Sequence, residues 1–141
     1  MTSLAHKVHY FETDKMGVVH HSNYIRWFED ARLAWLEKAG MPYAEAEKEG
    51  VVSPVVGMTC DYKRPVRFGD TVSVRIRAEK YTGVKLAFAY EVYLQDGSLA
   101  ATGTSRHCFM KEGVSHPVSL AREWPDLHAG VEQLAESDLN G

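Results

Sequence analysis

The stretch that most constrains the fold is a predicted helix of about five turns near the N-terminus. Its apolar residues recur with the spacing i, i+3, i+4, i+7 and i+11, which is typical of one buried helix face. The residues on this face are Tyr24, Trp27, Phe28, Ala31 and Trp35. Over residues 21–39 the helix would be roughly 28 Å long. Because the face is so aromatic, we expect the helix to lie across a β-sheet.

Both ends of this helix carry recognisable signals. At the start, the side chain of Ser22 or Asn23 can accept a hydrogen bond from an unpaired backbone N–H of the first turn. At the end, Gly40 can adopt the left-handed conformation that often closes a helix, and Pro42 cannot continue one. Residues 42–50, which close on another glycine, favour a short second helix.

The chain between residues 50 and 110 favours strands. Apolar and polar residues alternate over residues 72–79, and the next inward-facing set is Leu86, Phe88, Tyr90, Val92 and Leu94. Asp96-Gly97 is a strong signal for a two-residue hairpin turn. The preceding hairpin is expected to have Thr82-Gly83 at its tip.

Three further strands complete the predicted sheet. They are expected within residues 4–11, within residues 51–66 and within residues 99–110, where Gly103 indicates a bulge or bend. Pro54 and Pro65 confine the second of these to an edge or to strand ends. One strand, one long helix and four consecutive strands predict an α+β fold, an antiparallel sheet wrapped around the helix.

The length predicts a single domain over residues 1–141, with its core at about residues 5–112. The tail, residues 117–141, is weakly patterned. We expect one or two short helices within residues 119–136 and frayed structure over the last five residues.

Composition narrows the class of protein. A net charge of −3 argues against nucleic-acid binding, which usually requires a basic face. Cys60 and Cys108 lie in apolar, strand-like contexts and are expected to be buried free thiols in a reducing compartment. No N-terminal signal segment and no run of 18 apolar residues is present, so we expect a cytoplasmic protein that does not bind membranes.

The residues just before the long helix have the composition of a functional site. Asp14, Gly17, His20 and His21 fall within eight residues and lead into a helix N-terminus. A carboxylate at this place can act as a nucleophile or a general base, and the positive end of the helix dipole favours its charged form. The alternative is that Asp14 only caps a turn, which is the commonest use of aspartate in loops.

Two segments carry a resemblance to a known family. The first runs Tyr10-Phe-Glu-Thr-Asp14-Lys-Met-Gly17-Val-Val-His-His21-Ser-Asn23-Tyr24, and the second is Tyr62-Lys-Arg-Pro-Val-Arg-Phe-Gly-Asp70. Together with the layout, which matches over about residues 5–112, they resemble hotdog-fold acyl-CoA thioesterases of the 4-hydroxybenzoyl-CoA thioesterase-like family. The resemblance implies a homodimer or homotetramer, with active sites at the interface and a continuous sheet across the dimer. Many relatives have tyrosine where this chain has His20.

The resemblance also implies roles for individual residues. Asp14 would be the catalytic carboxylate, and a backbone N–H near His21 would bind the oxyanion that forms on the thioester carbonyl. The His21 imidazole would orient Asp14 or the thioester. Tyr10, Gly17 and Asn23 match motif positions that support the site.

Other groups have weaker claims to a role. Glu29 is the reserve catalytic residue, because a hotdog variant uses a helix glutamate, but a solvated ion pair with Arg32 is the first expectation. For the phosphates of coenzyme A the candidates are Thr82, Gly83 and Lys85, with Arg64 and Arg67 as further basic residues. Coenzyme A would be part of the substrate, so no separate cofactor is expected.

No metal site is predicted. His20 and His21 are adjacent and would not face one ion, and His6 and His9, three apart on a strand, would point to opposite faces.

Two other functions remain open besides hydrolysis of an acyl-CoA. A hotdog hydratase or dehydratase would carry an Asp-x-Asn-x-x-His signature, which Asp14-Lys15-Met16 lacks. A non-catalytic module that binds acyl thioesters is the second alternative. The sequence identifies neither the acyl group nor whether coenzyme A or an acyl-carrier protein carries it.

Overall fold

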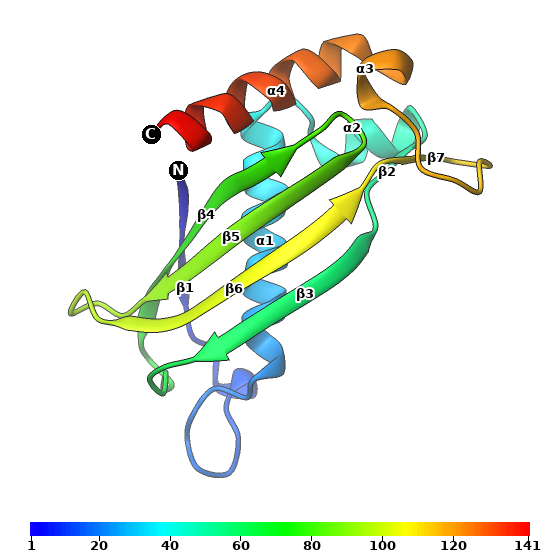
Figure 1. Ribbon diagram of the computed structural model, residues 1–141. Coiled ribbons are helices and arrows are strands. Elements are labelled where there is room, and N and C mark those ends of the chain that lie inside the picture. Colours follow the sequence, from blue (N-terminus) through cyan, green and yellow to red (C-terminus); the bar gives the residue numbers. More distant parts are fainter.

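The computed structural model describes residues 1–141 as one antiparallel sheet that curves around a central helix (Figure 1). The elements in chain order are β1 (Thr2–Lys7), the 3₁₀ helix η1 (Tyr10–Glu12), α1 (Ser22–Lys38), α2 (Tyr43–Lys48), β2 (Val51–Val52), β3 (Val55–Tyr62), β4 (Thr71–Tyr81), β5 (Lys85–Tyr93), β6 (Leu99–Cys108), β7 (Met110–Lys111), α3 (Leu120–Glu123) and α4 (Pro125–Asn140). The predicted α+β hotdog fold is confirmed.

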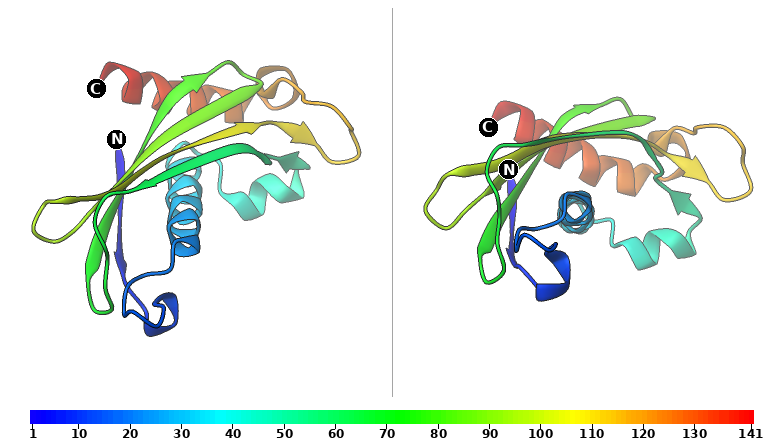
Figure 2. Two further views of the ribbon diagram at one scale, coloured as in Figure 1. Left: turned by 60° about the horizontal axis from the view of Figure 1, so that its bottom comes forward. Right: turned by 90° about the horizontal axis from the view of Figure 1, so that it is seen from below.

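The main sheet has five strands in the order β1-β4-β5-β6-β3, and every neighbouring pair is antiparallel. Helix α1 runs across its concave face (Figure 2). The residues that alternate toward α1 on β4 and β5 are fully buried: Val72, Val74, Ile76, Ala78, Leu86, Phe88, Tyr90 and Val92. The period-two pattern therefore predicted the buried face of the sheet correctly.

Helix α1 presses its aromatic face onto this sheet. Phe28 stacks on Tyr90 with ring centroids 4.4 Å apart, and Trp35 meets Phe88 edge to face at 4.9 Å. Phe28 also lies directly over Gly103, where an added Cβ would be 2.5 Å from Phe28 Cε2. Gly103 pairs in register on both sides, so the predicted bulge at this residue is wrong and the glycine instead admits the helix.

The start of α1 is capped differently from the prediction. His21 is the N-cap residue, and neither Ser22 nor Asn23 caps with its own oxygen. Instead the backbone N–H of Ser22 donates to His20 Nδ1 at 3.2 Å. The amide of Asn23 is a donor and points back toward the loop, to the Glu12 and His20 carbonyl oxygens at 2.9 and 3.3 Å.

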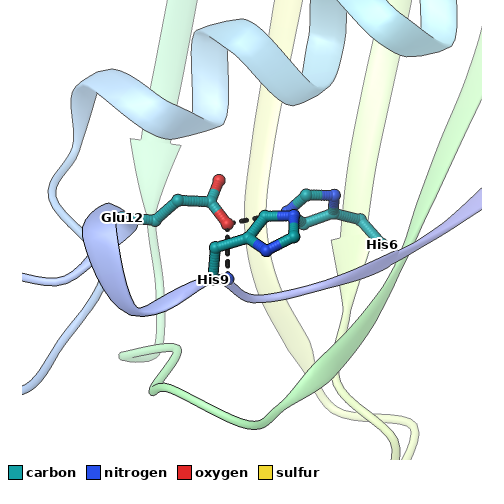
Figure 3. A group of neighbouring side chains, drawn as sticks. All are labelled: His6, His9 and Glu12. Atoms are coloured by element: carbon teal, nitrogen blue, oxygen red, sulfur yellow. Dashed lines mark hydrogen bonds and ion pairs between the residues drawn. The ribbon is translucent and has the colours of Figure 1, made fainter.

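The first strand is shorter than predicted. β1 ends at Lys7, and the chain then tightens into η1 rather than continuing as strand to residue 11. As a result His6 and His9 do not point to opposite faces, as predicted, but converge on the carboxylate of Glu12 (Figure 3). His6 Nε2 lies 2.9 Å from Glu12 Oε1, and the His9 backbone N–H donates to the same oxygen at 2.7 Å.

The tail is more ordered than predicted. α4 extends to Asn140 and packs along the upper half of β4, so the expectation of frayed final residues is wrong (Figure 1). Val131 and Ala135 belong to the core, and Asp138 is buried. The Asp138 carboxylate accepts hydrogen bonds from Trp35 Nε1, the Ala78 N–H and the Met1 amino group, all at 2.8 Å.

The predicted turns fall where expected, with one change in geometry. Residues 94–98 form the loop between β5 and β6, closed by the Leu94 N–H bond to the Ser98 oxygen at 2.9 Å, so the turn is longer than two residues. Cys60 and Cys108 are unpaired as predicted, although Cys60 is only half-buried. None of the helices combines the length and apolar character needed to span a bilayer.

Candidate active site

A pocket of about 360 Å³ opens where the start of α1 meets the end of β3. Its lining residues come from the loop before α1, the first turn of α1 and the end of β3 with the segment that follows: Asp14, Val18, Val19, His21, Tyr24, Tyr62, Lys63, Arg64 and Pro65. The structure thus brings together the two segments that carried the family resemblance.

Asp14 is half-buried in this pocket, and its own loop fixes one of its two oxygens. Oδ1 accepts from the Met16 N–H at 2.8 Å and, more weakly, from the Val18 N–H at 3.4 Å. No hydrogen bond within the protein occupies Oδ2. The carboxylate is therefore oriented through one oxygen while the other remains available for chemistry.

The loop that carries Asp14 is a closed hairpin-like turn. A bridge between Thr13 and Val19 joins its two arms, and the Asp14 N–H donates to the Val18 oxygen at 2.8 Å. Gly17 sits at the tip with φ of +77°, a conformation that side-chain-bearing residues rarely adopt. The glycine is needed for the turn and does not itself line the pocket.

The start of α1 supplies a free donor beside Asp14. The backbone N–H of His21 donates no hydrogen bond within the chain, whereas the N–H groups of Ser22, Asn23 and Tyr24 are all occupied. The His21 carbonyl is held by the Tyr62 hydroxyl, which donates to it at 3.2 Å. An unpaired N–H at a helix N-terminus is well suited to bind a developing oxyanion.

The two histidine side chains have different surroundings. The His21 ring lines the pocket and faces Tyr62 edge-on, with ring centroids 6.3 Å apart. The His20 ring does not line it; its Nδ1 contacts the hydroxyl and the N–H of Ser22. The His20 side chain therefore binds the first residue of the helix, while His21 can touch a ligand.

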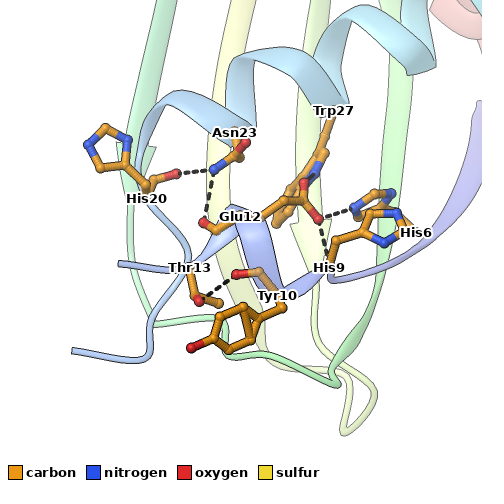
Figure 4. Close-up of polar contacts among 8 residues, drawn as sticks. All are labelled: His6, His9, Tyr10, Glu12, Thr13, His20, Asn23 and Trp27. Carbon is orange, nitrogen blue, oxygen red and sulfur yellow. Dashed lines mark hydrogen bonds and ion pairs between the residues drawn. The ribbon is translucent and has the colours of Figure 1, made fainter. Parts of the chain in front are cut away.

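Glu12, two residues before Asp14, is the hub of the polar contacts beneath the loop (Figure 4). Its buried carboxylate accepts hydrogen bonds from the His9 N–H, His6 Nε2 and Trp27 Nε1. Its backbone oxygen accepts from the His20 N–H and from the Asn23 amide. Burial alone would raise the pKa of Glu12, but the three donors lower it, so the carboxylate is held in its charged form.

The predicted supporting residues act by different means. Asn23 joins α1 to both ends of the loop through its amide. Tyr10 contributes only its carbonyl oxygen, which accepts from the Thr13 N–H and hydroxyl, while its ring is 74% exposed and leans on Phe68.

The predicted coenzyme A residues lie at the opposite end of the sheet from Asp14 (Figure 1). The Thr82 hydroxyl accepts from the backbone N–H groups of Val84 and Lys85, and the Gly83 carbonyl accepts from the Leu120 N–H. Lys85 lines a second pocket of about 360 Å³ together with Lys80 and Arg106. Within one protomer, these residues and Asp14 do not form one site.

Glu29 also lies outside the Asp14 pocket. It pairs with Arg32, as expected from their spacing, and the pair is solvated on one side only, because the Glu29 side chain is 43% exposed and the Arg32 side chain 6%. Arg32 Nε has no hydrogen-bond partner.

A buried polar chain lies near Arg32, between α1 and the sheet. The Tyr90 hydroxyl and His107 Nε2 each lie 2.7 Å from the Ser105 hydroxyl. Burial first, and then the nearby Arg32 charge, lower the pKa of His107 to about 4 despite an opposing effect of the Pro54 carbonyl. With no exposure to solvent at Ser105, this Ser-His pair is a structural element and not a reaction centre.

Sequence reasoning did not assign Glu12, Tyr62 or Lys63 to the site. Tyr62 and Lys63 stood in the second resembling segment, which was the only signal available for them. Glu12 stood in the first resembling segment, but nothing there indicated its role, since that role depends on an indole fifteen positions further along the chain.

Comparisons with known proteins agree with this fold and identify the class of enzyme. The family model described as the Thioesterase-like superfamily matches residues 8–126. A Bacillus subtilis protein described as the putative acyl-CoA thioesterase YneP is 37% identical over 127 residues, which cover 90% of this chain and 92% of that protein. The crystal structure of a DHNA-CoA thioesterase from Staphylococcus aureus superposes with a TM-score of 0.92 at 36% identity, covering 99% of this chain and 94% of that one.

A more distant relative is the acyl-CoA thioester hydrolase YbgC of Escherichia coli O6:H1, 28% identical over 93 residues, which cover 66% of this chain and 69% of that protein. The fold, the site and these similarities define a hotdog-fold thioesterase. The chain belongs to the thioesterase-like superfamily, and it is an enzyme that hydrolyses thioester bonds.

Proposed function

We propose that the protein hydrolyses the thioester of an acyl-CoA to a free acid and coenzyme A, with Asp14 as the reacting carboxylate. One observation carries the proposal: Asp14, with Oδ2 free, lines the same pocket as His21, whose backbone N–H is also free. A nucleophile or base and an oxyanion donor are the two groups that thioester cleavage requires. The names of the relatives support acyl-CoA as the substrate class.

Two routes use this geometry. In the first, Asp14 Oδ2 attacks the carbonyl carbon, the C–S bond breaks, the thiolate is protonated, and water then hydrolyses the mixed anhydride. In the second, Asp14 takes a proton from water, and the resulting hydroxide attacks the carbonyl carbon before the thiolate leaves. Both place negative charge on the carbonyl oxygen, where the His21 N–H would contribute on the order of 3 kcal/mol of transition-state stabilisation. The His21 imidazole orients the thioester or Asp14.

The active enzyme is a homodimer, or a tetramer built from such dimers. β3 pairs with β6 on one side only, and its outer edge exposes Val55 and Val56 at 44% and 56%. A free edge of eight residues with exposed apolar side chains is an unusual liability for a monomer and a ready pairing surface for a second copy. Light scattering should give about two or four times the chain mass of 15.8 kDa, and a monomer would contradict the proposal.

Pairing of β3 with its copy also accounts for the distant coenzyme A residues. Val56, near the start of β3, lines the Lys85 pocket, and Tyr62, at its end, lines the Asp14 pocket. Antiparallel pairing would bring the start of the partner's β3 beside the end of this one. We therefore assign the coenzyme A phosphates to Thr82, Gly83 and Lys85 of the partner subunit, with Lys80 and Arg106 of the same pocket in support.

The enzyme works in the cytoplasm, which the free thiols of Cys60 and Cys108 support. It uses no cofactor of its own, and an acyl-carrier protein is the alternative carrier of the acyl group.

The decisive experiment measures thiol release from a panel of acyl-CoAs by the intact protein and by Asp14→Asn. Asparagine keeps the Oδ1 contact with the Met16 N–H and removes the charge. The matched control is Asp96→Asn, because Asp96 Oδ1 accepts from the N–H two residues later at the same 2.8 Å but lies at an exposed hairpin tip. We expect at least a 100-fold loss of kcat for Asp14→Asn and no change for Asp96→Asn.

Other outcomes would redirect the assignment. Full activity of Asp14→Asn would move the chemistry elsewhere, with Glu29→Gln as the next variant. Binding of acyl-CoA without release of thiol would indicate a non-catalytic module. Hydration of an enoyl-CoA without thiol release would indicate a hydratase.

A further inference from the structure

Three side chains of metal-ligating type converge at the end of β1, outside the Asp14 pocket. His6, His9 and Glu12 each offer one ligand atom, and these atoms all lie within 4.8 Å of one another (Figure 3). None of the three lines the pocket. We propose that His6, His9 and Glu12 form a binding site for one transition-metal dication of the Zn²⁺ class.

Local backbone structure produces this convergence. His6 lies on the inner side of β1, with its ring centroid 5.0 Å from that of Trp27. His9 and Glu12 are the first and last positions of one 3₁₀ turn, in which residues three apart lie above one another. A continuation of β1 through residue 9 would have sent the two histidines to opposite faces.

The spacing of the ligand atoms fits an ion after a small adjustment. Around four-coordinate zinc, with bonds of about 2.0–2.2 Å, neighbouring ligand atoms lie roughly 3.3–3.5 Å apart. His6 Nε2 and Glu12 Oε1 are already 2.9 Å apart, so an ion that replaces their shared proton needs them to separate by only a few tenths of an ångström. His9 can close the remaining distance by a change of side-chain rotamer, because it is exposed.

The other contacts of Glu12 can persist in the bound state. Oε2 keeps its bond from Trp27 Nε1 at 2.8 Å, and Oε1 keeps the His9 N–H at 2.7 Å. Hydrogen bonds of this kind orient a ligating carboxylate and raise metal affinity. Two of the three ligands are thus already held in place, and the exposed side next to His9 leaves a fourth position for water.

The donor set selects the kind of ion. Two imidazole nitrogens and one carboxylate oxygen suit Zn²⁺, Co²⁺ and Ni²⁺, whereas Ca²⁺ and Mg²⁺ prefer oxygen ligands alone. Because the cluster lies outside the pocket, the ion would stabilise the junction of β1 and η1 and would not touch the substrate. The proposal is therefore independent of the reaction assigned to Asp14.

The test uses the full-length protein without a histidine tag, dialysed against chelator and titrated with Co²⁺ alone. We expect one equivalent to bind with visible d–d absorption, to be displaced by Zn²⁺, and to raise the melting temperature. His9→Ala should weaken Co²⁺ binding at least tenfold, because His9 is an exposed ligand whose loss leaves the fold intact. His116→Ala is the matched control, since His116 is exposed and its ring contacts only the adjacent Pro117 carbonyl.

Three results would overturn the proposal: no saturable binding, equal affinity in His9→Ala and the intact protein, or an intense near-ultraviolet charge-transfer band that places Co²⁺ on a cysteine thiolate. His6→Ala serves as a second variant, checked by circular dichroism because the His6 ring packs on Trp27. A folded His6→Ala protein that still binds Co²⁺ with full affinity would also exclude the site.

Discussion

Helix α1 is held at each end by a buried carboxylate, and the two ends differ in what else that carboxylate controls. Glu12 accepts the indole N–H of Trp27 near the start of the helix, and Asp138 accepts that of Trp35 near its end, both at 2.8 Å. Each carboxylate also accepts a backbone N–H, and in each case these bonds lower a pKa that burial alone would raise.

The surroundings separate the two otherwise similar arrangements. Glu12 also fixes both arms of the loop that carries Asp14, through its backbone oxygen (Figure 4). Asp138 belongs to α4, at the far end of the molecule from that loop (Figure 1). A buried carboxylate that accepts an indole N–H therefore contributes only to stability near the end of α1. At the start of α1 the same arrangement also positions the loop that carries Asp14.

The largest effect is expected from Glu12→Ala. The substitution leaves three donors without an acceptor in the interior, so the free energy of unfolding should fall by about 4 kcal/mol. The backbone oxygen of residue 12, which holds the Asp14 loop, remains, but the bonds from His9, His6 and Trp27 that fix η1 are lost. The loop is therefore held less precisely, and kcat/KM should fall at least tenfold in the protein that remains folded. Urea unfolding and thiol release measure the two quantities, and Glu12→Gln, which keeps an acceptor oxygen, should restore part of both. Normal kcat/KM in folded Glu12→Ala would show that Glu12, like Asp138, contributes only to stability.

Asp138→Ala should affect stability only. Loss of the acceptor for Trp35 Nε1 and the Ala78 N–H is expected to lower the free energy of unfolding by about 3 kcal/mol. The kcat/KM of the folded enzyme should stay within about twofold of the unmodified value, because the Asp14 pocket lies elsewhere. An activity loss as large as that of Glu12→Ala would show that the two ends are coupled.

Acid titration tests His107, a buried group that contacts neither the Glu12 nor the Asp138 carboxylate at the ends of α1. The pKa of His107 falls from 6.5 to about 4 in the folded protein, so the unfolded chain takes up a proton there first as the pH drops. Between pH 6.5 and pH 4 this should remove about 3 kcal/mol of unfolding free energy, at about 1.4 kcal/mol per pH unit. The lowered pKa values of Glu12 and Asp138 act in a lower range, because their contribution is lost only as the pH falls through those values.

His107→Gln removes this titration. The unfolding free energy of this variant, measured in urea at a series of pH values, should change much less between pH 6.5 and pH 4 than that of the unmodified protein. An unchanged slope would mean that His107 is not the group responsible.

The smallest effects are expected from the matched pair Trp27→Phe and Trp35→Phe. Each removes one indole N–H and part of a buried side chain, so each should cost about 2 kcal/mol of unfolding free energy. Only Trp27→Phe should also lower kcat/KM, by a few-fold, because only Trp27 supports Glu12. Equal activities of the two variants in a thiol-release assay would contradict the claim that only the Glu12 end of α1 positions the Asp14 loop.

Much of the fold was predictable because its signals are local. The helical spacing of residues 24–35 placed α1 to within one residue at each end, and period-two alternation placed β4 and β5. α4 was missed in extent because its stability comes from contacts with β4 and α1, through residues such as Val131 and Asp138. Val131, Ala135 and Asp138 do recur at helical spacing, but an aspartate gives no sequence signal that its position is buried.

The candidate site likewise contains residues that a local motif predicts and residues whose role depends on contacts made only after folding. Asp14 and His21 stand in a short contiguous motif, so the sequence could nominate them together. Glu12 could not be nominated, because its importance depends on donors from β1, η1 and α1 that meet only after folding. The predicted phosphate ligands Thr82 and Lys85 reach Asp14 in no single protomer, and the arrangement that would unite them requires a second chain.

Gly103 has a consequence for the shape of the Asp14 pocket. An added Cβ would lie 2.5 Å from Phe28 and 2.7 Å from the Thr59 oxygen, so any larger residue would lift α1 away from the sheet. Two lining residues of the Asp14 pocket come from the two layers that meet at Gly103: His21 lies at the start of α1 and Tyr62 at the end of β3. The distance between these two lining residues therefore depends on the absence of a Cβ at Gly103, which does not itself line the pocket. A substitution at position 103 is therefore expected to change the shape of the pocket while leaving every pocket-lining residue unchanged.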